Sequence, residues 1–497
     1  MTWTLGVMSQ ESDITDAQLL EADIDTLQQM MEKGGLTSTR LVQFYLHRIE
    51  QYNHQGVGLN AVQYLNPEVM TQAHNSDAER AASGPRSALH GIPVLVKDNY
   101  ETAGMPTSAG SILFAGFSPD RDAEQVSRLK AAGAIILGKT TMHEFAYGIT
   151  NQGSRYGSAK NPYVPTRNPG GSSGGTGAAV AANFAVVGMG SDTCGSIRIP
   201  AAQNNLVGLR GTLGLSSRTG IIPLSSTQDI GGPLARSVKD LAQVLDATVG
   251  FDPADPQTAE SLGKLPDSYY AHLAPMNNAR VGVLVDWMHQ DPDDEPVATV
   301  IRAGLAEMVK RTDWQVQDLD TADLVEVMQQ PLNGHFVLIH DFKQDINAYL
   351  QANPELGYAN IDALLEDGRV HASVIESLQA SANMGESTWG SYWYERGRRD
   401  VIRRQLLAMM AQHNVDALVY PTIRRIAAPL GEEQMGTNCR LSANSGLPAI
   451  SVPVGFVEGV PVGLEILAES WSEQKLLNLA LSVEQTLAVR QLPPATP

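Results

Sequence analysis

A glycine- and serine-rich block at residues 168–200 constrains the fold of this chain more than any other feature. It contains Ser172, within the run Gly-Gly-Ser-Ser-Gly-Gly, and Ser196, which follows 24 positions later (196 − 172). Glycines at this density let the backbone approach a ligand closely and direct N–H groups toward it. The stretch 178–189 between the serines is strongly apolar, which predicts a buried helix followed by a short strand. The block therefore predicts a functional site inside a core, because a flexible linker would stay polar.

The bulk composition indicates a globular protein with a sizeable core. The chain has 497 residues, 43% of them hydrophobic, and a mean hydropathy of −0.15. Its net charge of −19 argues against a surface for nucleic acid or for an anionic membrane. We find no membrane-spanning stretch and no signal peptide in the sequence as given. The two cysteines, Cys194 and Cys439, do not make a disulfide framework, so we expect a cytoplasmic protein.

Short apolar runs that alternate with helical patterns predict an α/β fold. The strand candidates are the β-branched runs at 92–96, 134–137, 185–189, 418–420 and 449–454. The helix candidates between or before them are 25–33, 38–52, 123–132 and 238–248. We expect one large domain with a mixed, largely parallel central sheet covered by helices on both faces.

Within this single domain, 1–497, the pattern divides the chain into four parts. These are a helical part at 1–75, a core that carries the site at 80–250, a mainly helical variable region over the site at 274–412, and strands and a helix that return to the core at 415–497.

The serine block and three further segments resemble the amidase signature family, whose members cleave carboxamides with a Ser–Ser–Lys triad. The block matches in the pattern G-G-S-S-G-G, followed by a second serine in D-x-x-G-S-I-R-x-P at the family spacing. The resemblance continues in segments 91–99, 138–146 and 445–455. It therefore implies the fold of that family, although the segment 274–412 matches nothing that we can name.

The resemblance implies a role for each of three residues. Ser196 would be the nucleophile, Ser172 would relay its proton from a position with a cis Gly171–Ser172 peptide, and Lys97 would be the terminal base. A serine hydroxyl needs such a base because it is a weak nucleophile at neutral pH. Lys97 must be uncharged to accept a proton, and burial lowers the pKa of a lysine from its usual value near 10.4. The alternative for Lys97 is a lysine at a strand end that reaches to solvent.

The backbone N–H groups of Thr193, Cys194, Gly195 and Ser196 would form the oxyanion hole. Each donor that points to developing charge typically contributes about 3–4 kcal/mol. Cys194 departs from the family, which commonly has glycine at this position. A positive φ there would strain the cysteine.

Three more residues complete the expected substrate-binding set: Ser173, Ala146 and Gly148. The resemblance places the stretch 145–148 along the substrate cleft, although ordinary core packing would also explain it. Hydrogen bonding within its own loop is an alternative for Ser173. Asp192 and Arg198 are expected to pair and brace the turn rather than to touch substrate.

Other motifs point to different chemistry. Residues 133–140 match G-x-x-x-x-G-K-T, but the residues between the glycines form an apolar run typical of a strand, which argues against a phosphate loop. Residues 170–174 match G-x-S-x-G, but no strand precedes them as a nucleophile elbow requires. Cys194 could be a nucleophile, but no acid–base partner lies near it in sequence. The eleven histidines show no metal-ligand spacing, so we expect no metal and no cofactor.

The sequence therefore predicts an amidohydrolase that cleaves a linear carboxamide through a seryl acyl-enzyme, releasing a carboxylic acid and ammonia or an amine. We expect the protein to bind a small-molecule amide, and to bind neither nucleic acid nor a membrane. A homodimer is one oligomeric state that we consider. An alternative is the ammonia-releasing (glutaminase) subunit of a tRNA-dependent amidotransferase, since family members of similar length do this with the same triad. A non-catalytic binding homologue is a third hypothesis, which the intact triad positions disfavour. The sequence does not indicate which acyl group is accepted. We expect the residues that determine substrate specificity to lie in 274–412.

Overall fold

The computed structural model describes residues 14–329 and 335–497, and its described part contains one 11-stranded sheet. The strands lie in the order β1-β3-β2-β4-β6-β5-β10-β11-β9-β7-β8. Their bounds are β1 Val62–Leu65, β2 Pro93–Lys97, β3 Ile135–Thr140, β4 Val187–Asp192, β5 Val207–Arg210, β6 Ile230–Ala235, β7 Arg280–Leu284, β8 Gln315–Leu319, β9 Ala417–Pro421, β10 Ala449–Val457 and β11 Val460–Leu467.

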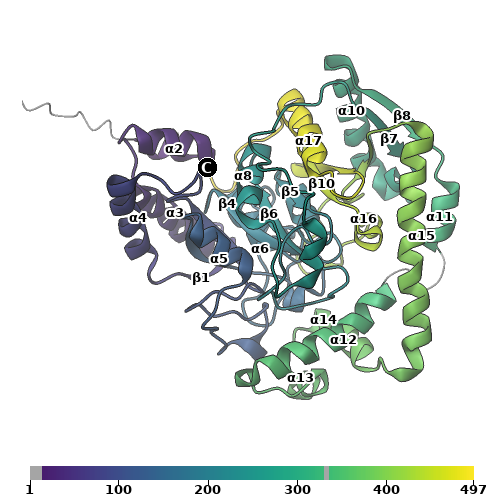
Figure 1. Ribbon diagram of the computed structural model, residues 1–497, viewed down its shortest axis with the longest axis horizontal. Coiled ribbons are helices and arrows are strands. Elements are labelled where there is room, and N and C mark those ends of the chain that lie inside the picture. The colour runs from purple at the N-terminus through teal and green to yellow at the C-terminus, as the bar shows by residue number, and fades with distance from the viewer. Residues whose placement is uncertain (1–13, 330–334) are drawn as a thin grey trace, which may run out of the picture.

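Helices surround this sheet (Figure 1). Their bounds are α1 Asp16–Leu19, α2 Ile24–Glu32, α3 Ser38–Ile49, α4 Val69–Ser83, α5 Glu124–Ala131, α6 Gly174–Ala181, α7 Arg198–Gln203, α8 Val238–Thr248, α9 Val285–Met288, α10 Glu295–Arg311, α11 Ala322–Gln329, α12 His335–Ala352, α13 Ile361–Asp367, α14 Ala372–Ala382, α15 Trp389–His413, α16 Arg440–Ser445 and α17 Glu473–Leu487. The expectations for residues 1–13 lie outside the described residues. No helix in the two described ranges is long and apolar enough to cross a membrane.

The sheet is mixed, as expected, but it contains fewer parallel pairs than expected. β2 lies parallel to β3 and β4, and β7 lies parallel to β8 and β9. The other six neighbouring pairs are antiparallel. The five strand candidates are all present as β2, β3, β4, β9 and β10, whereas the other six strands are not predicted. Two of these, β7 and β8, lie in the segment with mainly helical patterns. β8 is a sheet-edge strand with mostly polar, exposed residues, so it gives little apolar signal.

β10 and β11 show how helices cover both faces of the sheet. Pro453 is paired with Gly463, and a Cβ added to Gly463 would lie 2.6 Å from Ala202 of α7. The next residue, Val454, points to the opposite face because side chains alternate along a strand. Its Cβ would lie 3.3 Å from a Cβ added to Gly304 of α10. The predicted arrangement of one α/β domain with helices on both faces is therefore confirmed.

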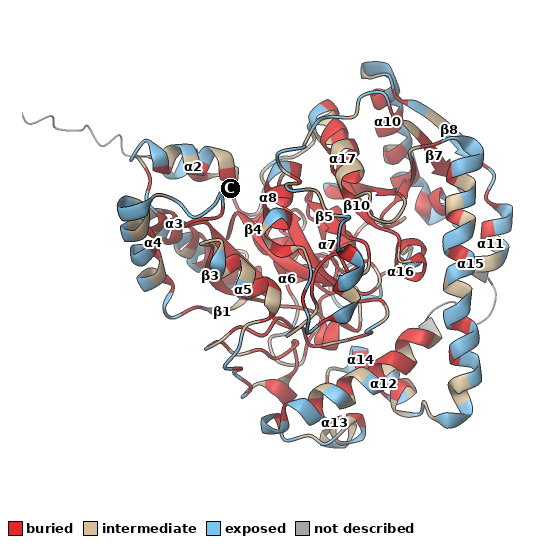
Figure 2. Cartoon of the chain, viewed as in Figure 1, coloured by how far each residue is buried: buried red, intermediate tan, exposed pale blue. Residues whose placement is uncertain are grey.

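The helices α12, α13 and α14 pack over the segment that follows β3. The ring of Phe342 in α12 lies 6.2 Å from that of Phe145 and 5.1 Å from that of Tyr147, between ring centroids. These residues belong to one apolar cluster with side chains of α13 and α14. Figure 2 shows that α15, at the edge of the molecule, is exposed along much of its length. The helical region thus contacts the site through α12 to α14, and through Arg399 of α15, which donates to the Gln228 side chain.

Candidate active site

Lys97 is the last residue of β2 and is completely buried. The strand lies between β3 and β4, and its apolar residues carry the lysine into the core. Lys97 Nζ donates hydrogen bonds to Ser172 Oγ at 2.7 Å and to Ser191 Oγ at 2.8 Å. The solvent-exposed alternative for this lysine is therefore wrong.

Burial lowers the pKa of Lys97 to about 7. The cause is desolvation, because removing the ammonium group from water disfavours its charged form. The charges of Asp192 and Asp229 act in the opposite direction and keep the pKa from falling further. Near neutral pH the amine is thus able to accept a proton.

Ser172 follows a cis peptide bond to Gly171, the feature that the resemblance implied. Its carbonyl oxygen accepts a hydrogen bond from the backbone N–H of His143 at 3.0 Å. A Cβ added to Gly171 would lie 2.8 Å from the backbone of Ile149 and Thr150. The glycine is therefore required here, because two backbone segments meet without room for a side chain.

Ser196 lies between β4 and α7 and lines a cavity of about 200 Å³. Its carbonyl oxygen accepts a hydrogen bond from the backbone N–H of Ser173 at 3.2 Å, so the two serine segments are in direct contact. The Ser173 hydroxyl donates to the carbonyl of Ser191 at 3.2 Å, and Ser173 does not line the cavity. The expectation that Ser173 binds substrate is thus corrected, since this serine holds the loop together behind the cavity.

Asp192 fixes the loop between β4 and α7. Its Oδ1 accepts the backbone N–H of Gly195 at 2.7 Å, and its Oδ2 accepts that of Ile197 at 3.1 Å. Gly195 has a φ of +93°, a conformation that favours glycine. Its N–H donates to the carboxylate, and Gly195 does not line the cavity. The structure therefore removes Gly195 from the expected oxyanion hole.

The other three backbone N–H groups of the expected hole remain available. In the described part of the chain, those of Thr193, Cys194 and Ser196 donate to no protein acceptor. All three residues line the cavity. A small oxygen anion in this cavity would thus meet a loop with three free donors.

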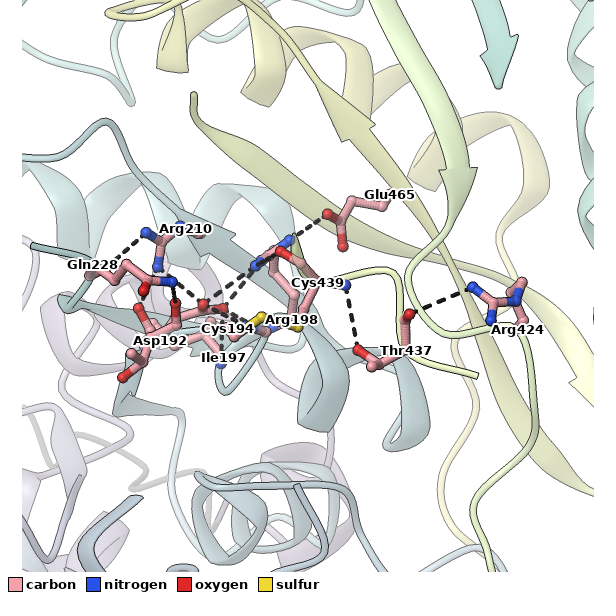
Figure 3. Close-up of a disulfide and its surroundings, with 12 residues drawn as sticks. Asp192, Cys194, Ile197, Arg198, Arg210, Gln228, Arg424, Thr437, Cys439 and Glu465 are labelled. Atoms are coloured by element: carbon pink, nitrogen blue, oxygen red, sulfur yellow. Dashed lines mark hydrogen bonds and ion pairs between the residues drawn. A yellow bond between two sulfur atoms is a disulfide. The ribbon is translucent and has the colours of Figure 1, made fainter. Parts of the chain in front are cut away.

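A buried charge network supports this loop from behind (Figure 3). Arg198 Nε donates to Asp192 Oδ2 at 3.1 Å, so the predicted pair is confirmed, and Arg210 Nη1 donates to Asp192 Oδ1 at 3.1 Å. Arg198 also contacts Glu465 of β11, which accepts a hydrogen bond from the Tyr420 hydroxyl at 2.9 Å. Burial alone would raise the pKa of Asp192, but the two arginines outweigh it and hold that pKa below its usual range. The carboxylate therefore stays ionised and continues to bind the loop amides.

Cys194 and Cys439 form a disulfide, with their Cα atoms 5.0 Å apart (Figure 3). The sequence indicated no disulfide framework and did not predict this bond, because 245 residues separate the two cysteines and nothing local indicates that they meet. Cys194 is thus no free nucleophile, and its φ is not positive, so the backbone strain considered above is absent. Disulfides persist mainly in oxidising compartments, so the cysteines no longer support a cytoplasmic location.

Gly148 lines the cavity, as expected, and it packs against His143. A Cβ added to Gly148 would lie 2.3 Å from the imidazole Cε1. His143 Nε2 lies 3.1 Å from the Ser373 hydroxyl of α14. Burial lowers the pKa of His143 to about 3, so the ring is neutral at ordinary pH. Gly148 thus lets a neutral ring link the cavity wall to the helical region.

Other parts of the chain complete the cavity lining. Ala146 lies in it as expected. Residues that the sequence analysis did not indicate are Leu224, Gln228, Leu338, Ser377, Arg440 and Asn444. They come from the β5–β6 connection, α12, α14 and α16, which only the folded chain brings together.

Among the described residues, neither a metal-binding cluster nor a larger cavity is an alternative to this site. The described residues contain no group of three or more histidine, cysteine, aspartate or glutamate side chains that could hold a metal ion. A cavity of about 680 Å³ lies between the first helices and the C-terminal segment, but no expected site residue lines it. The cavity at Ser196 is therefore the candidate active site.

A buried amine beside a serine hydroxyl, next to a second serine and free loop amides, defines a serine-dependent enzyme of acyl chemistry. The Amidase family model matches residues 40–477, and the chain belongs to this family. It is a serine amidase, a hydrolase of carbon–nitrogen bonds.

Three similar proteins illustrate the relationship. A probable amidase of Arabidopsis thaliana is 31% identical over 99% of this chain and 94% of its own length. A glutamyl-tRNA(Gln) amidotransferase subunit of Ectopseudomonas mendocina is 34% identical over 92% of this chain and 95% of its own length. The structure of native peptide amidase from Stenotrophomonas maltophilia superposes with a TM-score of 0.87 at 36% identity, covering 95% and 98% of the two chains. The predicted family and fold are thereby confirmed.

Proposed function

We propose that this protein hydrolyses a linear carboxamide through an acyl-enzyme on Ser196. One observation carries the proposal: the fully buried Lys97 amine, with a pKa of about 7, donates to Ser172 Oγ at 2.7 Å. The residue after Ser172 is hydrogen-bonded to the backbone of Ser196, which lines the cavity. A base, a relay and a nucleophile therefore follow one another from the core to the cavity.

In the proposed reaction, Ser196 Oγ attacks the amide carbonyl carbon and gives its proton to Ser172 Oγ. Ser172 passes its own proton to the uncharged amine of Lys97. The carbon–nitrogen bond then breaks as the nitrogen receives a proton back through Ser172, and ammonia or an amine leaves. Water attacks the resulting ester by the same proton route, which releases a carboxylic acid and restores the Ser196 hydroxyl.

The negative oxygen of the tetrahedral intermediate would lie against the N–H groups of Thr193, Cys194 and Ser196. Asp192 holds the loop in place before substrate arrives, because it bonds the neighbouring amides at 2.7 and 3.1 Å. Preorganised donors of this kind supply about 3–4 kcal/mol each. An ester substrate should also be cleaved, since the same donors stabilise either intermediate.

The test is a comparison of Ser196→Ala with Ser173→Ala on a simple amide and its ester. Loss of the nucleophile should lower kcat by at least about 10⁴-fold. Ser173→Ala is the matched control, because it removes a hydroxyl from the same buried loop without touching the proposed proton route. Mass spectrometry of the ester reaction should find the acyl group on Ser196. Substantial amide hydrolysis by Ser196→Ala would contradict the assignment.

The similarity to a glutamyl-tRNA(Gln) amidotransferase subunit favours a second candidate function. We propose, as this alternative, that the same residues release ammonia from glutamine inside a larger assembly. Glutamine hydrolysis that appears only after addition of partner proteins would support it. Efficient amide hydrolysis by the isolated chain would support the first proposal instead.

A further inference from the structure

Asn444 of α16 has an unsatisfied side-chain amide in the wall of the Ser196 cavity. The residue is 3% exposed and lines that cavity, and its Nδ2 has no hydrogen-bond partner in the described part of the protein. Two other polar residues of the wall are engaged: Gln228 Nε2 donates to the Thr193 carbonyl at 3.3 Å, and the Tyr147 hydroxyl lies 3.1 Å from that of Ser381. A buried amide donor without a partner costs about 1–3 kcal/mol, so a ligand acceptor at this part of the wall would relieve that cost.

Arg440 lies one helical turn before Asn444, so both side chains lie on the same face of α16. It is the one charged residue in the described lining of the cavity. Its guanidinium has no hydrogen bond or ion pair to any described residue, although five N–H groups are available for one. Desolvation lowers the pKa of Arg440 and no carboxylate opposes this effect. Arg440 is also exposed, so its positive charge lies where the cavity wall meets solvent, without a described carboxylate beside it.

The disulfide fixes this pair of side chains close to the reactive serine. Cys439 directly precedes Arg440, and its Cα lies 5.0 Å from that of Cys194, two residues before Ser196. Arg440 also lines an adjacent cavity of about 560 Å³, so it stands where the two spaces meet. The second arginine of that cavity, Arg424, is already bound to Asp294 at 3.0 Å. Arg440 is thus the free cation at the junction within the described lining.

We propose that Arg440 and Asn444 form a carboxylate subsite, which selects amide substrates that carry an anionic carboxylate a few bonds from the scissile carbonyl. This inference rests on the proposed amide hydrolysis for its place in the reaction. The guanidinium pairs with the carboxylate, and the Asn444 amide donates to one of its oxygens. Monoamides of short dicarboxylic acids have this form, with the two functional groups separated by two or three methylene groups.

The first test compares glutaramate, the monoamide of glutaric acid, with the analogue in which a methyl ketone replaces the carboxylate. The two substrates have similar size, and the ketone keeps one carbonyl oxygen but lacks the negative charge and the second acceptor oxygen. The native enzyme should favour glutaramate in kcat/KM by about 10–100-fold, the range of a charge-assisted hydrogen bond. Arg440→Gln should reduce this ratio to about threefold or less, and Arg440→Lys should retain part of it. A native ratio near one, or an unchanged ratio in Arg440→Gln, would overturn the subsite.

A binding measurement separates the subsite from the reaction. The Ser196→Ala variant should bind glutaramate more tightly than the ketone analogue in calorimetry, and adding Asn444→Asp should abolish this preference by placing a negative charge in the wall. Arg403→Gln is the matched control, because it removes an arginine from the exposed face of α15 and should leave every ratio unchanged. Preferential binding without turnover in the native enzyme would keep the subsite and refute the proposed function. Turnover of both amides without preferential binding of glutaramate would support the proposed function and overturn the subsite.

Discussion

The pKa of Lys97 makes a quantitative prediction about the pH dependence of this enzyme. The uncharged amine is the proposed base, and burial lowers its pKa from 10.5 to about 7. About half of the lysines are then uncharged at pH 7, compared with roughly 0.03% for an unperturbed side chain. Activity should therefore rise with pH through a single limb centred near pH 7. Between pH 5 and pH 8 the expected gain in kcat/KM is about 90-fold.

Asp229→Asn should move this limb in a defined direction. Asp229 is buried, and its charge raises the pKa of Lys97. Removing that charge should lower the pKa of the amine further, so the limb should shift to lower pH. Asparagine keeps one of the two oxygen acceptors: Asp229 accepts the Thr193 hydroxyl at 2.5 Å on one oxygen and the backbone N–H groups of Leu224 and Ser225 at 2.8 and 2.9 Å on the other. Asp400→Asn on the exposed face of α15 is the control and should leave the limb in place.

The assay is kcat/KM for a neutral amide from pH 5 to pH 9, with circular dichroism at each pH to show that the protein stays folded. Lys97→Arg should be inactive throughout, because a guanidinium does not lose its proton in this range. The reasoning is refuted if the native limb is absent, or if Asp229→Asn moves it to higher pH. Either result would mean that another group controls the rate.

The same shift affects stability. The folded state has the lower pKa, so between pH 7 and 10.5 the unfolded chain binds more protons and stability should rise with pH. The full contribution is about 5 kcal/mol, at 1.36 kcal/mol for each unit of pKa. Lys97→Met should lack this contribution. The difference between its unfolding free energy and that of the native protein should therefore favour the variant most near pH 7 and decline toward pH 10. Urea unfolding at the two pH values measures the difference.

Two further substitutions test the wall of the cavity. Gly148→Ala would press a methyl group against the His143 ring, so it should cost about 1–3 kcal/mol of unfolding free energy and reduce kcat/KM. Gly116→Ala is its control, since a Cβ there meets nothing within 4 Å, and equal melting temperatures for the two variants would contradict the packing argument. Cys439→Ser should cost about 2–5 kcal/mol in thermal or denaturant unfolding, because the disulfide closes a loop of 245 residues. A reductant should destabilise the native protein but not this variant, and a native melting temperature that is insensitive to reductant would count against the bond.

The residues proposed for proton transfer could be picked out in the sequence because their signals are local. Ser172 lies among glycines that no linker explains, and Ser196 follows it at a fixed interval with an apolar helix and strand between. The run before Lys97 is apolar, which is how a strand carries a lysine into a core. Each of these features depends on residues close together in the chain. The structure could therefore confirm the buried lysine and its contact with Ser172.

The corrections arise where a contact spans the chain. Cys194 and Cys439 are too far apart in sequence for their bond to leave a local pattern. The Gly195 amide was expected to face substrate, yet the carboxylate of Asp192 accepts its hydrogen. Which of several adjacent N–H groups a nearby carboxylate accepts depends on the turn of the loop in three dimensions. Composition and spacing do not specify that turn.

The sequence by itself determined the family, the α/β class and the three residues proposed for proton transfer, since glycine patterns and apolar periodicity are properties of neighbouring residues. The tertiary structure alone decided the surroundings of those residues. It placed α16 beside the Ser196 loop, left Arg440 without a partner among the described residues at the cavity wall, and buried Lys97 deeply enough to lower its pKa to about 7. Burial and charge compensation depend on every group that packs nearby, and most of those groups are distant in sequence.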